Sequence, residues 1–232
     1  TGVPMEGTKI KINEEGEILV KGEGLFVGYH DNKKATDEAI RDGWFHTGDW
    51  GRINENGHVI VYDRLKDVIT LKSGHKFAPQ YIESRLKFSP YINDAIILGG
   101  QEYDYITAII SIEFDNVTKW ADKKRINYLT YADLSQKEQI YDLLHNEIKR
   151  ANETLPKESQ IKRFVSLYKQ LDADDQELTR TRKVKRNVFE EKYRDIIDGL
   201  YSNVEEVQIE AEVKYRGGKT RVIKMPVSIR DV

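Results

Sequence analysis

The chain has 232 residues, enough for one large domain or two smaller ones, and its 33% of charged residues beside 39% hydrophobic ones indicates a small-cored, well-solvated protein. The net charge of −2 demands no polyanionic partner, and the absence of cysteine excludes disulfides, thiolate zinc sites and cysteine nucleophiles. No apolar run approaches the roughly 18 residues of a membrane-spanning helix, so we expect a cytoplasmic protein, with peripheral membrane contact left open.

The first part of the chain is predicted to form short strands and one helix. Two apolar runs at 9–13 and 17–21, joined through a turn that contains Gly16, predict a β-hairpin. A short helix is expected over 33–41. Gly43 is expected to cap it, because glycine readily takes the left-handed conformation that ends helices.

The middle of the chain mixes helices and strands. Pro79 suits the first turn of a helix, where no amide donor is needed. Apolar residues recur at helical spacing over 134–155, and Ser135 with Glu138 forms a capping-box pattern at the start of that helix. Another helix is expected at 187–198. Strands are expected at 59–62, 67–71, 94–98, 105–110 and 161–168.

The tail, residues 203–232, has two strictly alternating segments that predict a hairpin with one apolar face. A three-residue loop, 217–219, would pair Val213 with Ile223 and Ile209 with Val227, which keeps the apolar residues on one face. A lone hairpin is not stable, so this one is expected to dock on a neighbouring element. These elements indicate an α+β fold class in three segments: 1–63, 64–199 and 200–232.

Several short segments suit ligand binding, although each has an ordinary structural explanation. Gly48 before Asp49 can present a carboxylate whose two acceptors suit a vicinal diol such as ribose, or can form a plain turn. The charges over 63–67 fit a solvated connection. Gly74 fits a close ligand approach or a turn. Five of the seven residues over 180–186 are basic, which fits phosphate, nucleic acid, an anionic membrane or solvent.

The order of these segments is more informative than any one of them. Together they resemble the last third of the acyl-adenylate-forming enzymes, which include acyl-CoA synthetases, firefly-type luciferases and peptide-synthetase adenylation domains. The resemblance covers about residues 3–198. The matching segments are Glu23-Gly-Leu-Phe-Val-Gly-Tyr29, Gly43-Trp-Phe-His-Thr-Gly-Asp49, Asp63-Arg-Leu-Lys-Asp67, Ser73-Gly-His-Lys76 and Thr179-Arg-Thr-Arg-Lys-Val-Lys-Arg186.

The final segment is most similar to that of long-chain fatty acyl-CoA synthetases. Arg182 precedes Lys183 where the wider family usually has glycine, and the long-chain branch shares this departure. Lys183 is therefore the matching lysine, with Lys185 as the alternative. The resemblance implies that 1–63 is the end of a large N-terminal domain, that 64–199 is a mobile C-terminal domain with antiparallel sheets flanked by helices, and that 200–232 is a β-hairpin extension.

The resemblance also implies a reaction and a role for each matching residue. ATP with Mg²⁺ and a fatty acid give acyl-AMP, and CoA then displaces AMP. Lys183 would be catalytic. The other residues would bind the nucleotide (Asp49, Arg64, Lys76), act as the hinge (Lys66) and border CoA (Ser73, Gly74). The phosphate loop, adenine pocket and acyl tunnel of the family lie upstream of the segments present, so we expect a piece of a longer protein that is inactive alone and holds no tightly bound cofactor.

Other functions remain as alternatives. The chain could belong to a ligase for another acid or to an adenylation domain that serves a carrier protein. A basic module binding nucleic acid or lipid would leave the motif order unexplained, so no nucleic-acid partner is expected. The five histidines lack metal-ligand spacing, and 172–175 is too short for a calcium loop, so no metal site is predicted. Oligomeric state is not assigned.

Overall fold

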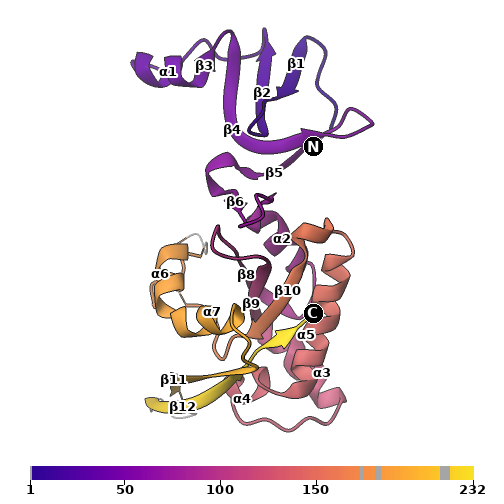
Figure 1. Cartoon of the computed structure of the whole chain (residues 1–232), viewed down its shortest axis with the longest axis vertical. Coiled ribbons are helices and arrows are strands. Elements are labelled where there is room, and N and C mark those ends of the chain that lie inside the picture. Colours follow the sequence, from indigo (N-terminus) through magenta and orange to yellow (C-terminus); the bar gives the residue numbers. More distant parts are fainter. Residues whose placement is uncertain (1, 173–174, 181–183, 215–219) are drawn as a thin grey trace. The chain divides into compact units, whose positions relative to one another are not determined.

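The computed structural model describes residues 2–172, 175–180, 184–214 and 220–232, and the chain folds as two compact units (Figure 1). The first comprises Thr1–Ile69 and Lys76–Tyr81, and the second comprises Thr70–His75 and Ile82–Val232. Both units combine helices with sheets, which confirms the predicted α+β class.

The first unit is built on an antiparallel sheet with strand order β1-β2-β4-β3, and β5 also pairs with β4. Its strands are β1 (Thr8–Ile12), β2 (Glu17–Gly22), β3 (Ile40–Arg41), β4 (Trp44–Ile53) and β5 (Val59–Arg64). The predicted β1–β2 hairpin is confirmed. Asn13 closes its turn, because its side-chain oxygen accepts the amides of Glu15 and Glu17 at 3.0 and 2.8 Å.

The helix predicted at 33–41 forms as α1 (Lys33–Ala39), but Gly43 does not cap it, so that part of the prediction is wrong. Ile40 takes an extended conformation and leads directly into β3. Asp42 and Gly43 have φ of +53° and +73° and form the two-residue turn between β3 and β4. Positive φ at both central residues is typical of a hairpin turn whose twist matches the strands.

Short elements connect the sheets of the two units along the chain. They are the 3₁₀ turn η1 (Leu65–Asp67), the two-stranded pair β6 (Ile69–Thr70) and β7 (Lys76–Phe77), and α2 (Pro79–Leu86). Pro79 begins α2, as predicted from its lack of an amide donor.

The second unit contains a four-stranded sheet with the order β13-β10-β9-β8. Its strands are β8 (Ile92–Leu98), β9 (Ile106–Ile112), β10 (Ile161–Ser166) and β13 (Arg230–Asp231). β9 and β10 are parallel, in contrast to the expected antiparallel pairing, because a helical crossover joins them. Every residue of β9 is buried, so both faces of the sheet are covered.

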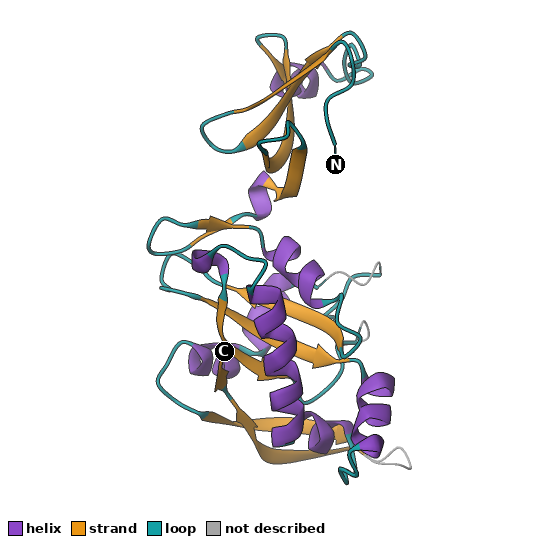
Figure 2. Cartoon of the chain, turned by 90° about the vertical axis from the view of Figure 1, so that its right-hand side faces the viewer, coloured by secondary structure: helices purple, strands orange, loops and turns teal. Residues whose placement is uncertain are grey.

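Helices supply that cover. In Figure 1 the sheet lies between α5 and the pair α6 and α7, and Figure 2 shows α5 lying across the strands. The helices of this unit that follow β9 are α3 (Phe114–Lys123), α4 (Tyr131–Ser135), α5 (Glu138–Asn152), α6 (Arg186–Lys192) and α7 (Arg194–Leu200), and the 3₁₀ turn η2 (Lys157–Ser159) precedes β10.

Two helices predicted as continuous are interrupted. The stretch 134–155 divides between α4 and α5, and the capping box of Ser135 and Glu138 does not form: Ser135 is buried and donates to the Ala132 carbonyl at 3.0 Å. The helical conformation is interrupted at Gln136, whose side-chain Nε2 donates to the Ser166 carbonyl of β10 at 2.6 Å. Likewise 187–198 divides between α6 and α7 at Tyr193.

The tail forms the predicted hairpin from β11 (Glu206–Lys214) and β12 (Thr220–Ser228), but in a different register. Ile209 is opposite Met225, rather than Val227 as predicted, and Val213 is opposite Arg221. The shift is by two residues, so it preserves which residues share a face. The predicted loop 217–219 lies outside the described residues. Val207, Ile209, Val227 and Ile229 join the hydrophobic core with α7, so the base of the hairpin is docked.

Candidate functional site

Asp49 and Arg64 are the predicted site residues that the structure brings into contact. They are opposite each other on β4 and β5, with Arg64 Nη1 3.1 Å from Asp49 Oδ1. The same nitrogen donates to the Thr47 carbonyl at 3.1 Å. Both side chains remain accessible, at 32% for Asp49 and 60% for Arg64. The pair therefore offers acceptor oxygens and a donor side by side to a polar ligand such as a vicinal diol.

A β-bulge places Asp49 beside that arginine. Glu17 of β2 is opposite Trp50 and Leu19 is opposite His46, so Ile18 alone spans Thr47, Gly48 and Asp49. Gly48 has φ of +69°, a conformation that glycine takes without steric strain. The turn read at this position from the sequence is thus a bulge within one long strand. Bulges bend a strand and redirect its side chains, and they are common next to active sites.

Glu17, which the motif analysis passed over, lies behind the bulge and is 6% exposed. Its Oε1 accepts the Gly48 amide at 3.0 Å, and its Oε2 lies 2.8 Å from His46 Nδ1. An acid among the apolar residues that begin β2 was the available signal in the sequence, since a buried carboxylate is rare without partners.

Ser73 and Gly74 lie in the turn between β6 and β7. Gly74 has φ of +85°, and a Cβ added there would meet nothing within 4 Å. In the described structure the backbone conformation, and not crowding, therefore calls for glycine. The Gly74 amide donates to the Leu71 carbonyl at 2.9 Å and closes the turn. Lys66 in η1 and Lys76 in β7 are both exposed.

Lys183, the predicted catalytic lysine, lies outside the described residues. The chain on either side of it is described. Leu178 and Val184 form an antiparallel bridge, and the Lys185 amide donates to the Glu177 carbonyl at 2.9 Å. The two flanks of the final motif are therefore fastened to each other immediately before α6.

Glu177, a second acid that the motif analysis passed over, is fully buried at the start of that motif. Its Oε1 lies 2.9 Å from Lys169 Nζ and 2.7 Å from Lys192 Nζ, and accepts the Tyr193 hydroxyl at 2.6 Å. Burial alone would raise the pKa of Glu177, but these hydrogen bonds outweigh it and hold the pKa below the ordinary value of 4.5. The cluster ties Glu177 to the C-terminal end of α6.

Arg186, the last basic residue of the motif, also makes contacts within the second unit. It pairs with Glu83 of α2, and its Nη1 donates to the Ile97 carbonyl at 2.8 Å. Burial raises the pKa of Glu83, although Arg186 opposes that shift. The basic run is therefore not a uniform surface patch, which weakens the nucleic-acid and lipid alternatives.

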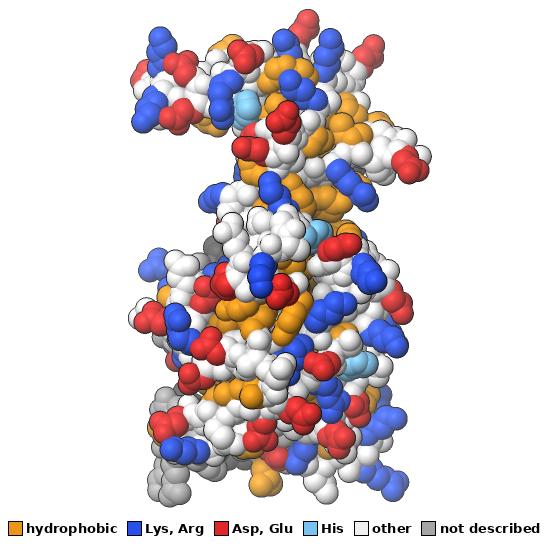
Figure 3. Space-filling view, in the orientation of Figure 1, with side chains coloured by type: hydrophobic (Ala, Val, Ile, Leu, Met, Phe, Trp, Pro, Cys, Tyr) orange, Lys and Arg blue, Asp and Glu red, His pale blue; other side chains and the backbone are white. Residues whose placement is uncertain are grey.

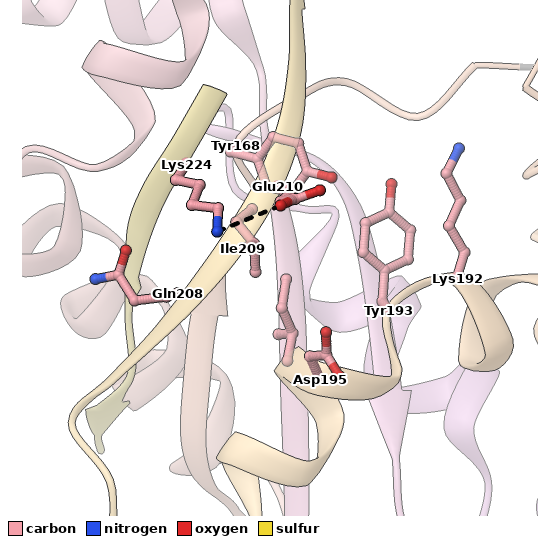
Figure 4. Close-up of a pocket in the computed structure, with 9 residues that line it drawn as sticks. Tyr168, Lys192, Tyr193, Asp195, Gln208, Ile209, Glu210 and Lys224 are labelled. Atoms are coloured by element: carbon pink, nitrogen blue, oxygen red, sulfur yellow. Dashed lines mark ion pairs between the residues drawn. The ribbon is translucent and has the colours of Figure 1, made fainter. Parts of the chain in front are cut away.

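A cavity of about 440 Å³ lies between α6, α7 and the hairpin, and Figure 4 shows its walls. Lys192 and Tyr193 on one side belong to the Glu177 cluster. On the other side Lys224 Nζ lies 3.6 Å from Glu210 Oε1. The cavity is thus lined by groups that already pair with residues of the second unit.

Charges of both signs are mixed on the face shown in Figure 3. Within the part of the chain that the structure describes, no three His, Cys, Asp or Glu side chains are grouped so as to hold a metal ion. Among the same residues, no helix has the length and apolar character required to cross a membrane.

Comparison with known proteins identifies the family. A family model described as the AMP-binding enzyme C-terminal domain matches residues 66–205. Long-chain-fatty-acid–CoA ligase FadD15 of Mycobacterium tuberculosis is 33% identical over 87% of this chain and 34% of its own length. Long chain acyl-CoA synthetase 1 of Arabidopsis thaliana is 30% identical over 82% and 29%. The chain thus spans about a third of the length of these relatives.

Solved structures support the fold. The A domain of carboxylic acid reductase from Segniliparus rugosus, solved in complex with AMP and a co-purified carboxylic acid, superposes with a TM-score of 0.60 at 18% identity, covering 86% of this chain and 32% of that one. Apo MatB from Rhodopseudomonas palustris gives 0.55 at 23% identity, covering 84% and 36%. With the family model matching more than half of its length, this chain belongs to the AMP-binding enzyme C-terminal domain family.

Proposed function

We propose that this chain is the C-terminal part of an AMP-forming ligase that joins a long-chain fatty acid to CoA. The observation that carries the proposal is the Asp49–Arg64 pair, held across β4 and β5 at the positions where the resemblance calls for ribose-binding residues. Relatives named as long-chain ligases, at 33% and 30% identity, support the choice of acid.

In the first step the carboxylate of the acid attacks the α-phosphorus of ATP, and pyrophosphate leaves; ATP would bind together with Mg²⁺. Asp49 and Arg64 bind the ribose hydroxyls, and Lys76 provides a cation near the phosphates. Lys183 bridges the carboxylate and the α-phosphate. Because the negative charge shifts between these groups in the transition state, a lysine placed there lowers the barrier.

In the second step the thiol of CoA attacks the acyl carbonyl, and AMP leaves. Lys66 is the hinge about which the C-terminal domain turns between the steps, and it lies three residues before Ile69, where the first stretch of the first unit ends. Ser73 and Gly74 then border the pantetheine arm. The domain division at 64 and the hairpin extension from 200 are part of the same proposal.

The two half-reactions test the proposal in the full-length ligase that contains this chain. Lys183→Ala should abolish acyl-adenylate formation, measured as pyrophosphate release, and spare transfer from a supplied acyl-adenylate to CoA. Loss of only the second step would refute the assignment of Lys183. A matched Lys185→Ala variant tests the alternative lysine.

The acid itself is tested with a panel of carboxylic acids. A long-chain substrate predicts that a sixteen-carbon acid gives a higher kcat/KM than acetate, malonate or benzoate. Preference for one of the short acids would move the chain to a ligase of another class. The 232-residue chain alone is expected to form no acyl-adenylate, because the resemblance places the phosphate loop and acyl tunnel in the upstream domain.

A further inference from the structure

We propose that Glu17 is a positioning residue for nucleotide binding: its buried carboxylate holds the β4 bulge in the shape that presents Asp49 to the ribose. The inference rests on the ribose-binding role proposed above for Asp49. The motif resemblance gives no role to Glu17, whereas the contacts around the bulge do.

The bulge leaves backbone groups without their usual strand partners. Three residues of β4 are opposite Ile18, so the regular ladder between β2 and β4 is interrupted there. An unpaired buried amide is costly, and bulges persist where other groups satisfy them. The Gly48 amide finds its acceptor in Glu17 Oε1 at 3.0 Å.

Thr47 fastens the other side of the bulge. Its hydroxyl donates to the Ile18 carbonyl at 2.7 Å and accepts the Asp49 amide at 3.0 Å. Glu17 thus accepts the Gly48 amide. The next residue of β2, Ile18, accepts the Thr47 hydroxyl, which in turn binds the Asp49 amide. The Asp49 side chain is left to meet Arg64.

The Glu17 carboxylate is itself fixed in position. His46 Nδ1 lies 2.8 Å from Oε2, and Asn13 Nδ2 donates to the same oxygen at 3.2 Å. The Glu17 amide is held by Asn13 Oδ1 at 2.8 Å. A hydrogen-bonded, 6%-exposed carboxylate has little freedom to follow a displaced strand, so a defined bulge geometry results.

The test is the ability of the full-length ligase to distinguish ATP from 2′-deoxy-ATP and 3′-deoxy-ATP, measured as the ratio of kcat/KM values. Loss of hydrogen bonds to a charged group predicts that Asp49→Ala lowers this ratio by about 10–100-fold. Glu17→Gln should lower it by roughly 5–20-fold, mainly through KM for ATP, because it weakens uniform binding of the nucleotide.

A matched control separates positioning from simple loss of stability. Val59→Ala removes buried apolar atoms from β5 of the same sheet, where Val59 is 6% exposed, and should leave the ribose ratio within about twofold of wild type. If Glu17→Gln changes the ratio no more than Val59→Ala does, the inference is wrong. If Asp49→Ala itself keeps the ratio, the ribose role in the proposed function fails instead.

A second measurement does not depend on activity. In the 232-residue chain, Glu17→Gln should increase hydrogen exchange of the Gly48 amide at least tenfold, because its charged acceptor is lost, whereas Val59→Ala should not single out that amide. Unchanged exchange at Gly48 would overturn the inference. If Glu17→Gln does not fold, Thr47→Val, which replaces the hydroxyl with a methyl group, should lower the ribose ratio in the same direction and increase hydrogen exchange of the Asp49 amide, whose acceptor is that hydroxyl.

Discussion

Gly199 near the end of α7 tests how the tail hairpin docks on the helix. A Cβ at this position would lie 2.3 Å from Val207 Cγ2 and 2.8 Å from Ile229 Cδ1. In an open helix, Gly→Ala stabilises by about 1 kcal/mol. Overpacking a core costs about 1–3 kcal/mol, and a β-branched valine cannot turn aside easily. We therefore expect Gly199→Ala to destabilise the second unit by up to about 2 kcal/mol, the overpacking cost less the gain in helix propensity.

Urea unfolding followed by far-UV circular dichroism measures this. The midpoint should fall at an unchanged slope. The double variant Gly199→Ala with Val207→Ala should be less destabilised than the sum of the two single variants by about 1 kcal/mol, because removing the Val207 methyl groups relieves the clash. Gly24→Ala, where an added Cβ meets nothing within 4 Å, is the control. Stabilisation by Gly199→Ala, or additivity with Val207→Ala, would refute this packing.

Three other variants probe the candidate site. Gly74→Ala should lower the free energy of unfolding in urea by about 1–2 kcal/mol, because the φ of +85° is unfavourable for alanine. Gly74→Asn should lower it less, because asparagine tolerates this conformation. Equal losses for the two variants would point to crowding. Because the pKa of Glu177 is lower in the folded state than its ordinary 4.5, its stabilisation is present above pH 4.5 and lost as pH falls through the folded-state value. Glu177→Gln should therefore make stability less pH-dependent below pH 4.5, and an unchanged acid limb of the urea series would contradict this. Arg186→Lys should cost about 1–2 kcal/mol in the same assay, since lysine cannot reproduce the fork to Glu83 and Ile97; a purely electrostatic basic run predicts no loss.

Local patterns predicted many of the strands and helices, because alternation and helical spacing act over a few residues, but they did not predict β4 or α3. The details that failed depend on distant partners. α4 and α5 are separated at Gln136, whose side chain donates to the distant Ser166 carbonyl, and α6 and α7 are separated at Tyr193, whose hydroxyl donates to Glu177. The hairpin register is wrong by two because alternation fixes which face a side chain occupies but not its partner across the strand.

The candidate site could be predicted only through the order of its motifs. The pair of Asp49 and Arg64 follows from the register of β4 and β5, which no single motif contains. Glu17 and Glu177 have at most a weak local signal, since an acid beside apolar residues is also ordinary at an exposed position. Both residues are buried and hydrogen-bonded in the folded chain, and their burial depends on elements that are distant in the sequence.

The basic run of 180–186 shows why charge counting alone was ambiguous. From the sequence its residues are equivalent cations, but the fold gives the described members different surroundings. Arg186 is bound to Glu83, whereas Lys185 has an exposed side chain and a backbone amide held by Glu177. An electrostatic patch would need its cations to face one partner together. The flanks of the run are fastened instead by backbone contacts, the Leu178–Val184 bridge and the Lys185 amide that donates to the Glu177 carbonyl.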